Sequence, residues 1–237
     1  MDSALEKKLR MLVDVFLIEN AKLNLSAFRT PESCWTGNIL DSLAVVGNSP
    51  LPQAGEGLGV RAGNKSSTSV VSILDLGTGG GFPLLPLAVS LPSARFTGMD
   101  ATLKKIDAVG RIVEQMALKN VELICGRAEA LGRVARHREQ YDLVLCRAVA
   151  QIAVNLEYCS PFVRPGGRII LWKSMDVEEE LKTSGHAQKE LRCRLTAAHV
   201  YELPGDFGKR QLLIFEKAGK LPDMYPRAVG VAKKKPL

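Results

Sequence analysis

The sequence lacks the features of a membrane or exported protein. No apolar run is long enough to span a bilayer, so we expect no transmembrane helix. The first residues, MDSALEKKLRML, mix acids and bases, which is typical neither of a signal peptide nor of an acid-poor transit peptide. We therefore expect a protein of a reducing compartment, the cytoplasm or, alternatively, an organelle matrix or stroma.

Cysteine motifs are also missing. The five cysteines form an odd set without a Cys-x-x-Cys pair, which disfavours both a disulfide framework and a zinc site. No metal is expected. Cys125 and Cys146 lie in apolar runs, so both are predicted to be small core residues.

The glycine-rich stretch ILDLGTGGGFP, residues 73–83, lacks the marks of two nucleotide-binding motifs. A dinucleotide fingerprint reads Gly-x-Gly-x-x-Gly, but its third glycine position holds Phe82 or Leu84, depending on the starting glycine. No Gly-Lys-Ser/Thr follows, so a P-loop for triphosphates is excluded. What remains is a loop, with glycines at 77 and 79–81, that lets backbone approach a ligand without cradling a phosphate chain.

The pattern along the chain predicts one α/β domain with additions at both ends. Residues 1–46 read as an N-terminal helical cap, 47–69 as a flexible Gly/Pro/Ser-rich connection, and 218–237 as a basic tail. Between them, apolar strands alternate with helices, which is typical of a parallel sheet with right-handed crossovers. These strands are expected at 70–76, 94–99, 121–125, 141–146 and 168–172. Two later strands, 199–203 and 211–216, are joined by a Pro/Gly turn and predict an antiparallel edge.

An acid at the end of the second strand indicates the ligand. Asp100 lies 25 positions after Asp75 (100 − 75), where a carboxylate accepts hydrogen bonds from both ribose hydroxyls and repels a 2′-phosphate. A ribose without a diphosphate is implied, and S-adenosylmethionine (SAM) fits. Its amino-acid end would meet the glycine loop near Asp75, its ribose Asp100, and its adenine the backbone of Ala128 and Glu129.

With these motifs in view, the chain resembles the RsmG family, also called glucose-inhibited division protein B. The likeness rests on NLSAFRTPESCW, ILDSLAV, ILDLGTGGGFP, GRAEAL, YDLVLCRAVA, PFVRPGGRIILWK, YPRAVG and KKKPL, which together run over nearly the whole chain. The resemblance implies a Rossmann-like, class I SAM-dependent methyltransferase with a seven-stranded, mostly parallel sheet. It also implies an activity on N7 of a guanosine in small-subunit rRNA.

The resemblance assigns roles to particular residues. Cofactor binding would fall to Gly77, Phe82, Ala128, Glu129 and Arg147, with Gly79 and Asp100 added from the loop and strand pattern. The RNA and reaction centre would use the arginines at positions 127, 147 and 210. The chain departs from the family pattern at Asn38, where the family usually has His, and at Leu84, where it usually has Gly. A substrate contact by that histidine is therefore not transferred to Asn38.

The chemistry of the strand ends agrees with N7 as the acceptor. The fourth strand ends in LCRAVA, without the Asn/Asp-Pro-Pro-aromatic motif common in transfer to exocyclic amines. Guanine N7 carries a lone pair and no proton, so attack on the methyl group requires positioning rather than a general base. Arg127, Arg147, Lys173 and Arg210 are expected at one sheet edge as a phosphate-binding rim.

Three alternatives remain open at this point. A small-molecule SAM methyltransferase would share the cofactor site, and a nucleotide-dependent oxidoreductase would share the fold. An RNA-binding module without catalysis would keep only the basic surface. The net charge of +7 permits a polyanionic partner without proving one. The partner expected from the resemblance is small-subunit rRNA, within or outside the ribosomal subunit, bound by a monomer.

Overall fold

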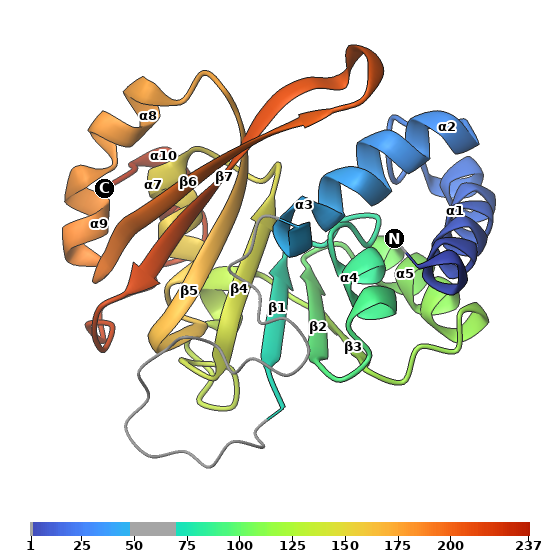
Figure 1. Cartoon of the computed structure of the whole chain (residues 1–237). Helices are drawn as coiled ribbons and strands as arrows, with labels where there is room; N and C mark the ends of the chain where they lie inside the picture. The colour runs from blue at the N-terminus through green and yellow to red at the C-terminus, as the bar shows by residue number, and fades with distance from the viewer. Residues whose placement is uncertain (1, 48–69) are drawn as a thin grey trace.

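A single seven-stranded sheet forms the centre of the molecule, in a computed structural model that describes residues 2–47 and 70–237 (Figure 1). The strand order is β3-β2-β1-β4-β5-β7-β6. The strands are β1 Ser72–Leu76, β2 Arg95–Asp100, β3 Val121–Cys125, β4 Tyr141–Arg147, β5 Val163–Ser174, β6 Cys193–Leu203 and β7 Gly208–Lys217. The first five are parallel, and β7 is antiparallel to both β5 and β6. The predicted sheet, including its antiparallel last strand, is confirmed.

The topology brings the predicted site residues to one edge. The chain runs outward from β1 to β3 and then returns to β4 on the other side of β1. In such sheets ligands bind at the carboxyl ends of the strands, next to the point where the order reverses. The glycine loop follows β1, Asp100 ends β2, and Arg147 ends β4, so all three lie at this edge.

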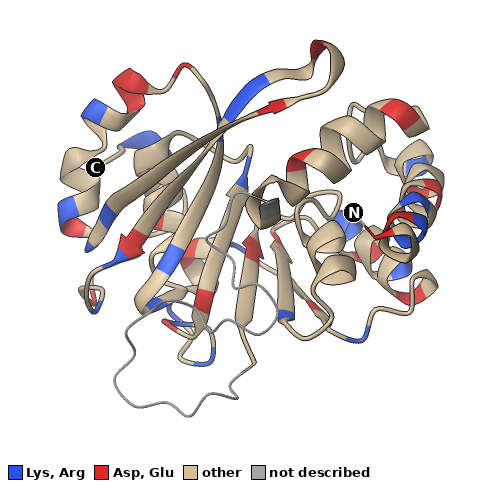
Figure 2. Ribbon diagram, viewed as in Figure 1, with Lys and Arg blue, Asp and Glu red and all other residues tan. Residues whose placement is uncertain are grey.

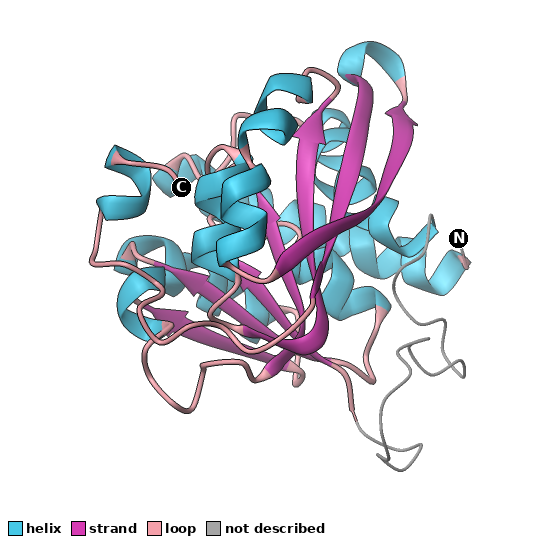
Figure 3. Cartoon of the chain, turned by 90° about the vertical axis from the view of Figure 1, so that its left-hand side faces the viewer, coloured by secondary structure: helices cyan, strands magenta, loops and turns pink. Residues whose placement is uncertain are grey.

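Helices cover both faces of the sheet (Figure 3). Helices α4 (Leu84–Ser90) and α5 (Leu103–Gln115) share one hydrophobic cluster with the N-terminal helices. A second cluster buries α7 (Ile152–Cys159), α9 (Gly185–Glu190) and the start of the C-terminal segment. The remaining helices are short: α6 Ala128–Leu131, α8 Glu178–Thr183, the 3₁₀ turn η2 Gly205–Phe207, and α10 Val231–Lys234. Helices α6, α8, α9 and α10 were not predicted from the sequence.

The N-terminal cap contains a helix whose winding changes part-way. It follows α1 (Ser3–Leu23) and consists of α2 (Pro31–Cys34), the π-helical η1 (Trp35–Leu40) and α3 (Asp41–Gly47). Its start is capped, because the Thr30 hydroxyl accepts from the Ser33 amide at 3.2 Å and Pro31, whose missing N–H costs nothing there, is the first helical residue. The π segment was not predicted. Such segments are rare and often occur at functional sites.

The C-terminal segment is attached to the body by specific bonds. Arg138 donates to the Tyr225 carbonyl at 2.9 Å, and Arg227 pairs with Glu157 of α7 at 2.5 Å. Further on, α10 contacts α7. The basic run RVARHR, residues 133–138, therefore contributes Arg133 and Arg138 to binding tail carbonyls.

The two cysteines predicted to be core residues differ in exposure. Cys146 is buried, but Cys125 is exposed, because β3 is the edge strand of the sheet and has no neighbour beyond it. The expected connection at 47–69 lies, apart from Gly47, outside the described residues. Among the described residues, no helix combines the length and apolar character needed to cross a membrane.

Candidate functional site

The loop after β1 requires glycine for its conformation. Gly77, Gly79 and Gly81 have φ values of +77°, +57° and +90°, in the left-handed region that side chains disfavour. A Cβ on Gly77 would lie 2.6 Å from Val149 Cγ2, so the segment after β4 packs directly on this loop. The glycines therefore allow both the turn and its close contact with the neighbouring segment.

Asp100 contacts the glycine loop directly. Its Oδ2 accepts a hydrogen bond from the Gly79 amide at 3.1 Å, and its Oδ1 accepts from the Thr102 amide at 2.8 Å. A carboxylate offers about four acceptor positions, so these bonds leave capacity for a ribose diol. Two residues predicted to share the cofactor site, 21 positions apart, thus lie side by side.

Asp75 is a buried acid with one oxygen still available. Its Oδ2 accepts from the Thr78 hydroxyl at 2.7 Å and from the Leu84 amide at 3.2 Å, while its Oδ1 has no partner among the described residues. Burial raises the pKa of this carboxyl to about 6, against the lowering effects of its hydrogen bonds and of Arg147. A buried acceptor without a donor fits a ligand that brings an ammonium group, as the amino-acid end of SAM does.

Phe82 is mainly a packing residue. It is buried, and its ring meets that of Phe16 edge-on with centroids 4.7 Å apart. The Arg147 guanidinium carbon lies over the Phe82 ring, 5.8 Å from its centroid. Leu84, in place of the family's glycine, fits because Gly98 on β2 leaves room. A Cβ there would lie 2.5 Å from Leu84 Cδ2.

Arg147 is held by the N-terminal cap. One of its terminal nitrogens donates to Asp41 Oδ2 at 2.8 Å and to the Gly37 carbonyl at 3.3 Å, and the other donates to Asn38 Oδ1 at 3.0 Å. Asp41 and Asn38 are both buried. The cap residues thereby fix the arginine at the end of β4.

Arg210 reaches the same acid from β7. Its Nε lies 3.8 Å from Asp41 Oδ1, too far for a hydrogen bond, and its side chain is 37% exposed. The Tyr201 hydroxyl donates to that Oδ1 at 2.6 Å, and the Trp172 indole donates to the Asp41 carbonyl at 2.9 Å. Arg147 and Arg210, predicted to share a site, are thus brought together, and Asp41 is the residue between them.

The other predicted site residues lie apart from this cluster. Arg127 is exposed at the start of α6, next to half-buried Ala128. Glu129 is buried, and its Oε1 accepts from the Gly230 amide of the tail at 2.9 Å. Lys173 pairs with Glu180 at 2.6 Å and donates to the Ala150 carbonyl at 3.0 Å, so its charge is already neutralised inside the protein.

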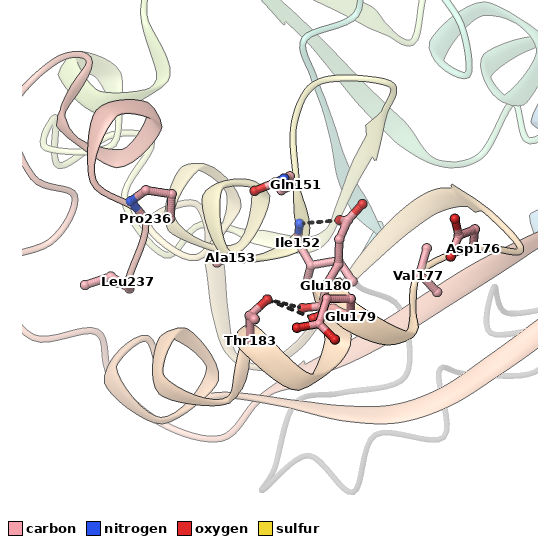
Figure 4. Close-up of a pocket in the computed structure, with 10 residues that line it drawn as sticks. All are labelled: Gln151, Ile152, Ala153, Asp176, Val177, Glu179, Glu180, Thr183, Pro236 and Leu237. Carbon is pink, nitrogen blue, oxygen red and sulfur yellow. Dashed lines mark hydrogen bonds between the residues drawn. The ribbon is translucent and has the colours of Figure 1, made fainter.

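A cavity of about 500 Å³ lies between the start of α7, helix α8 with the segment leading into it, and the C-terminus (Figure 4). Glu180 crosses it to accept from the Ile152 amide at 2.9 Å. None of the predicted site residues lines it. Among the described residues, no cluster of three or more His, Cys, Asp or Glu side chains is arranged to hold a metal ion.

Comparison with known families identifies the family of the chain. The family model described as "GidB: rRNA small subunit methyltransferase G" matches residues 5–206. The chain belongs to the GidB family. It is therefore a SAM-dependent methyltransferase of small-subunit rRNA, with guanine N7 as its acceptor.

Individual members of the GidB family align over most of their length. Ribosomal RNA small subunit methyltransferase G of Carboxydothermus hydrogenoformans is 35% identical over 98% of this chain and 90% of its own. The protein of the same name from Deinococcus deserti is 38% identical over 92% and 83%. Among solved structures, a SAM-dependent methyltransferase from Methanosarcina mazei is similar at 15% identity and a TM-score of 0.49, covering 65% of this chain and 95% of that one.

Two cap residues of this GidB-family chain contact Arg147 although neither was predicted as a site residue: Asn38 was set aside, and Asp41 was not considered. Asn38 stands where the family usually has histidine. Its Oδ1 accepts from Arg147, and its Nδ2 donates to Ser26 Oγ and Cys34 Sγ, so its amide is bonded within the protein. Asp41 was not predicted as a site residue. The sequence indicates it only through its position in ILDSLAV, one of the motifs that carry the resemblance. Its partners lie on strands distant in the chain, so no local pattern identifies it as a site residue.

Proposed function

We propose that this GidB-family chain binds SAM at the carboxyl ends of β1, β2 and β4 and presents it to a guanosine beside Arg210. The proposal is carried by the contact between the Gly79 amide and Asp100 and supported by the buried Asp75 Oδ1, which has no partner among the described residues. The remaining cofactor contacts are assigned to Gly77, Phe82, Ala128, Glu129 and Arg147. When bound, SAM supplies an electrophilic methyl group on a sulfonium.

The protein's own task in this proposal is positioning and charge. Guanine N7 attacks through a free lone pair, so no side chain has to remove a proton. Asp100 orients the ribose, and Asp75 accepts from the amino-acid end. The loop glycines let backbone approach closely. For transfer to guanine N7, it is sufficient that the site excludes water and aligns the methyl group of SAM with the N7 lone pair.

Three arginines are proposed for the RNA and reaction centre. Arg210 is half-exposed and Arg127 is exposed, so both can offer guanidinium donors to phosphate or ribose oxygens. Arg147 has most of its donors bound to Asp41, Asn38 and Gly37, which favours a cofactor-side role over a phosphate contact. An arginine forked onto N7 would block the nucleophile, so no such contact is proposed.

Replacing Asp100 by alanine is expected to weaken SAM binding about 10- to 150-fold. The physical reason is the loss of ribose hydrogen bonds to a charged acceptor, worth roughly 1.5–3 kcal/mol. Isothermal calorimetry on the wild type, Asp100→Ala and Asp100→Asn measures this, with NADH as a ligand that none of them should bind. Unchanged SAM affinity in Asp100→Ala would remove this residue from the ribose site.

Replacing Arg210 by alanine is expected to leave SAM affinity within about twofold of wild type and to lower methyl transfer to rRNA. Loss of one phosphate contact should also reduce the slope of log Kd against log salt by about 0.7–0.9. Anisotropy titrations with a labelled rRNA fragment at several salt concentrations give this slope. Normal turnover together with an unchanged slope would exclude Arg210 from the RNA site.

The oligomeric state, the form of the RNA substrate and the compartment go beyond what family membership implies. We infer a monomer that acts on small-subunit rRNA, as naked RNA or within the ribosomal subunit, in the cytoplasm or in an organelle matrix or stroma. A splayed base from a loop is the expected presentation, because the A-form major groove hides N7 from side chains. Mass mapping of methylated nucleotides in rRNA from cells lacking the protein identifies the guanosine.

A further inference from the structure

We propose that Asp41 is a positioning residue for methyl transfer, holding Arg147 on the cofactor side and Arg210 on the RNA side through one carboxylate. The inference rests on the proposed function of the same edge. It adds Asp41, a residue of the N-terminal cap, to the site residues that the sheet supplies. The inference is based on the placement and the hydrogen bonds of the Asp41 side chain.

Asp41 joins the cap to four strands at the edge where the site lies. It is 1% exposed and begins α3, directly after the π-helical segment. Its carboxylate contacts Arg147 of β4, Tyr201 of β6 and Arg210 of β7, and its carbonyl accepts from Trp172 of β5. The hairpin of β6 and β7 extends over the cap, with an acidic position at its tip and basic positions nearer the body of the sheet (Figure 2). The Phe207 and Phe28 rings lie 5.4 Å apart.

The two carboxylate oxygens of Asp41 interact differently with the two arginines. Oδ2 accepts a direct hydrogen bond from Arg147 at 2.8 Å. Oδ1 accepts from the Tyr201 hydroxyl at 2.6 Å. Arg210 Nε lies 3.8 Å from Oδ1 and has no hydrogen-bond partner within residues 2–47 and 70–237. Arg210 is thus attracted by charge while its guanidinium donors remain unused among the described residues.

The Tyr201 hydroxyl causes this difference, because it occupies the Asp41 oxygen that lies nearest Arg210. Burial, with the adjacent Asp41 carboxylate, raises the pKa of the Tyr201 phenol, so the hydroxyl stays protonated and donates. Two guanidinium groups share one carboxylate, which leaves excess positive charge at the start of β7. An arginine with spare donors and excess local charge suits an RNA phosphate. An arginine already fully bonded to protein would not.

A purely structural staple would behave differently from a positioning residue. A staple would connect cap and sheet, and its loss would lower stability without a selective effect on RNA. A positioning residue acts through Arg210, so its effect on RNA binding must vanish when Arg210 is absent. This difference is the basis of the test.

The experiment is a double-mutant cycle on the full chain with Tyr201→Phe and Arg210→Ala. Removing the hydroxyl frees Asp41 Oδ1 to bond Arg210 Nε, which draws the guanidinium inward. We expect Tyr201→Phe to weaken binding of a labelled rRNA fragment, measured without cofactor, about three- to tenfold, the size of one hydrogen bond. KM for RNA should rise by a similar factor, with SAM affinity changed less than about twofold. In the Arg210→Ala background Tyr201→Phe should change none of these.

Tyr141→Phe is the matched control, because it removes a buried hydroxyl from the opposite end of the same sheet. It should leave RNA binding unchanged. Equal effects of Tyr201→Phe in both backgrounds, or none in either, would overturn the proposal. Calorimetry keeps the two hypotheses apart. A wild type that does not bind SAM refutes the proposed function, whereas a wild type that binds and methylates while Tyr201→Phe is silent refutes only the role of Asp41.

Discussion

Replacing Arg227 by alanine is expected to lower the free energy of unfolding by about 3–5 kcal/mol, the cost of leaving a buried charge unpaired. Arg227 binds both oxygens of Glu157, with distances from 2.5 to 3.1 Å, and its own amide donates to the same carboxylate at 3.0 Å. The Glu157 side chain is 1% exposed. Without the guanidinium it must stay ionised in the core, become protonated, or release the tail.

Chemical denaturation of the wild type and Arg227→Ala measures this loss. Arg194→Ala is the matched control, since its pair with Glu216 is long, at 3.6 Å, and its side chain is 72% exposed. That variant should lose less than about 1 kcal/mol. Glu157→Gln combined with Arg227→Met should recover much of the stability by removing both charges. If Arg227→Ala is no less stable than Arg194→Ala, the tail does not depend on this pair.

SAM is expected to bind about tenfold more weakly at pH 5 than at pH 7. With a pKa of about 6 in the free protein, Asp75 is mostly protonated at pH 5 and mostly ionised at pH 7. An ammonium group at Asp75 Oδ1 pairs with the ionised form, so binding below pH 6 must first remove a proton. The affinity therefore rises with pH through this range and levels above it.

Calorimetry from pH 5 to 8 on the wild type and Asp75→Asn tests this dependence. The variant should bind weakly with a flat pH profile. 5′-Methylthioadenosine, which lacks the amino-acid end, is the matched ligand and should bind the wild type equally at pH 5 and 7. A pH-independent SAM affinity in the wild type would show that Asp75 does not receive the ammonium.

The same acid predicts a pH dependence of folding. The folded pKa of Asp75 is raised from 3.8 to about 6, so the unfolded chain releases this proton more readily than the folded one. Stability contributed by the neutral carboxyl is present below the unfolded value and is lost as the pH rises to about 6. The shift corresponds to about 3 kcal/mol. Asp75→Asn, which cannot ionise, should therefore be more stable at pH 7 relative to wild type than at pH 4.

The sequence predicted those parts of the site that follow from short segments. The glycine loop and the acid ending β2 are local features of strand-to-helix turns, and alternating strands and helices permit few sheet topologies. Their contact through Gly79 and Asp100 arose as the topology required. Exposure was harder to predict, as Cys125 illustrates. An apolar run does not reveal whether its strand lies at the sheet edge.

The sequence by itself determined the alternation of strands and helices, the ligand edge and the glycine loop, because each depends on residues close together in the chain. Only the tertiary structure decided the partners of the charged residues. Arg147 meets Asp41 across 106 positions and Arg227 meets Glu157 across 70, while Lys173 is neutralised by Glu180 on the following helix. The Coulomb energy of a pair depends on separation in space and on burial. Neither quantity is contained in the spacing of residues along the chain.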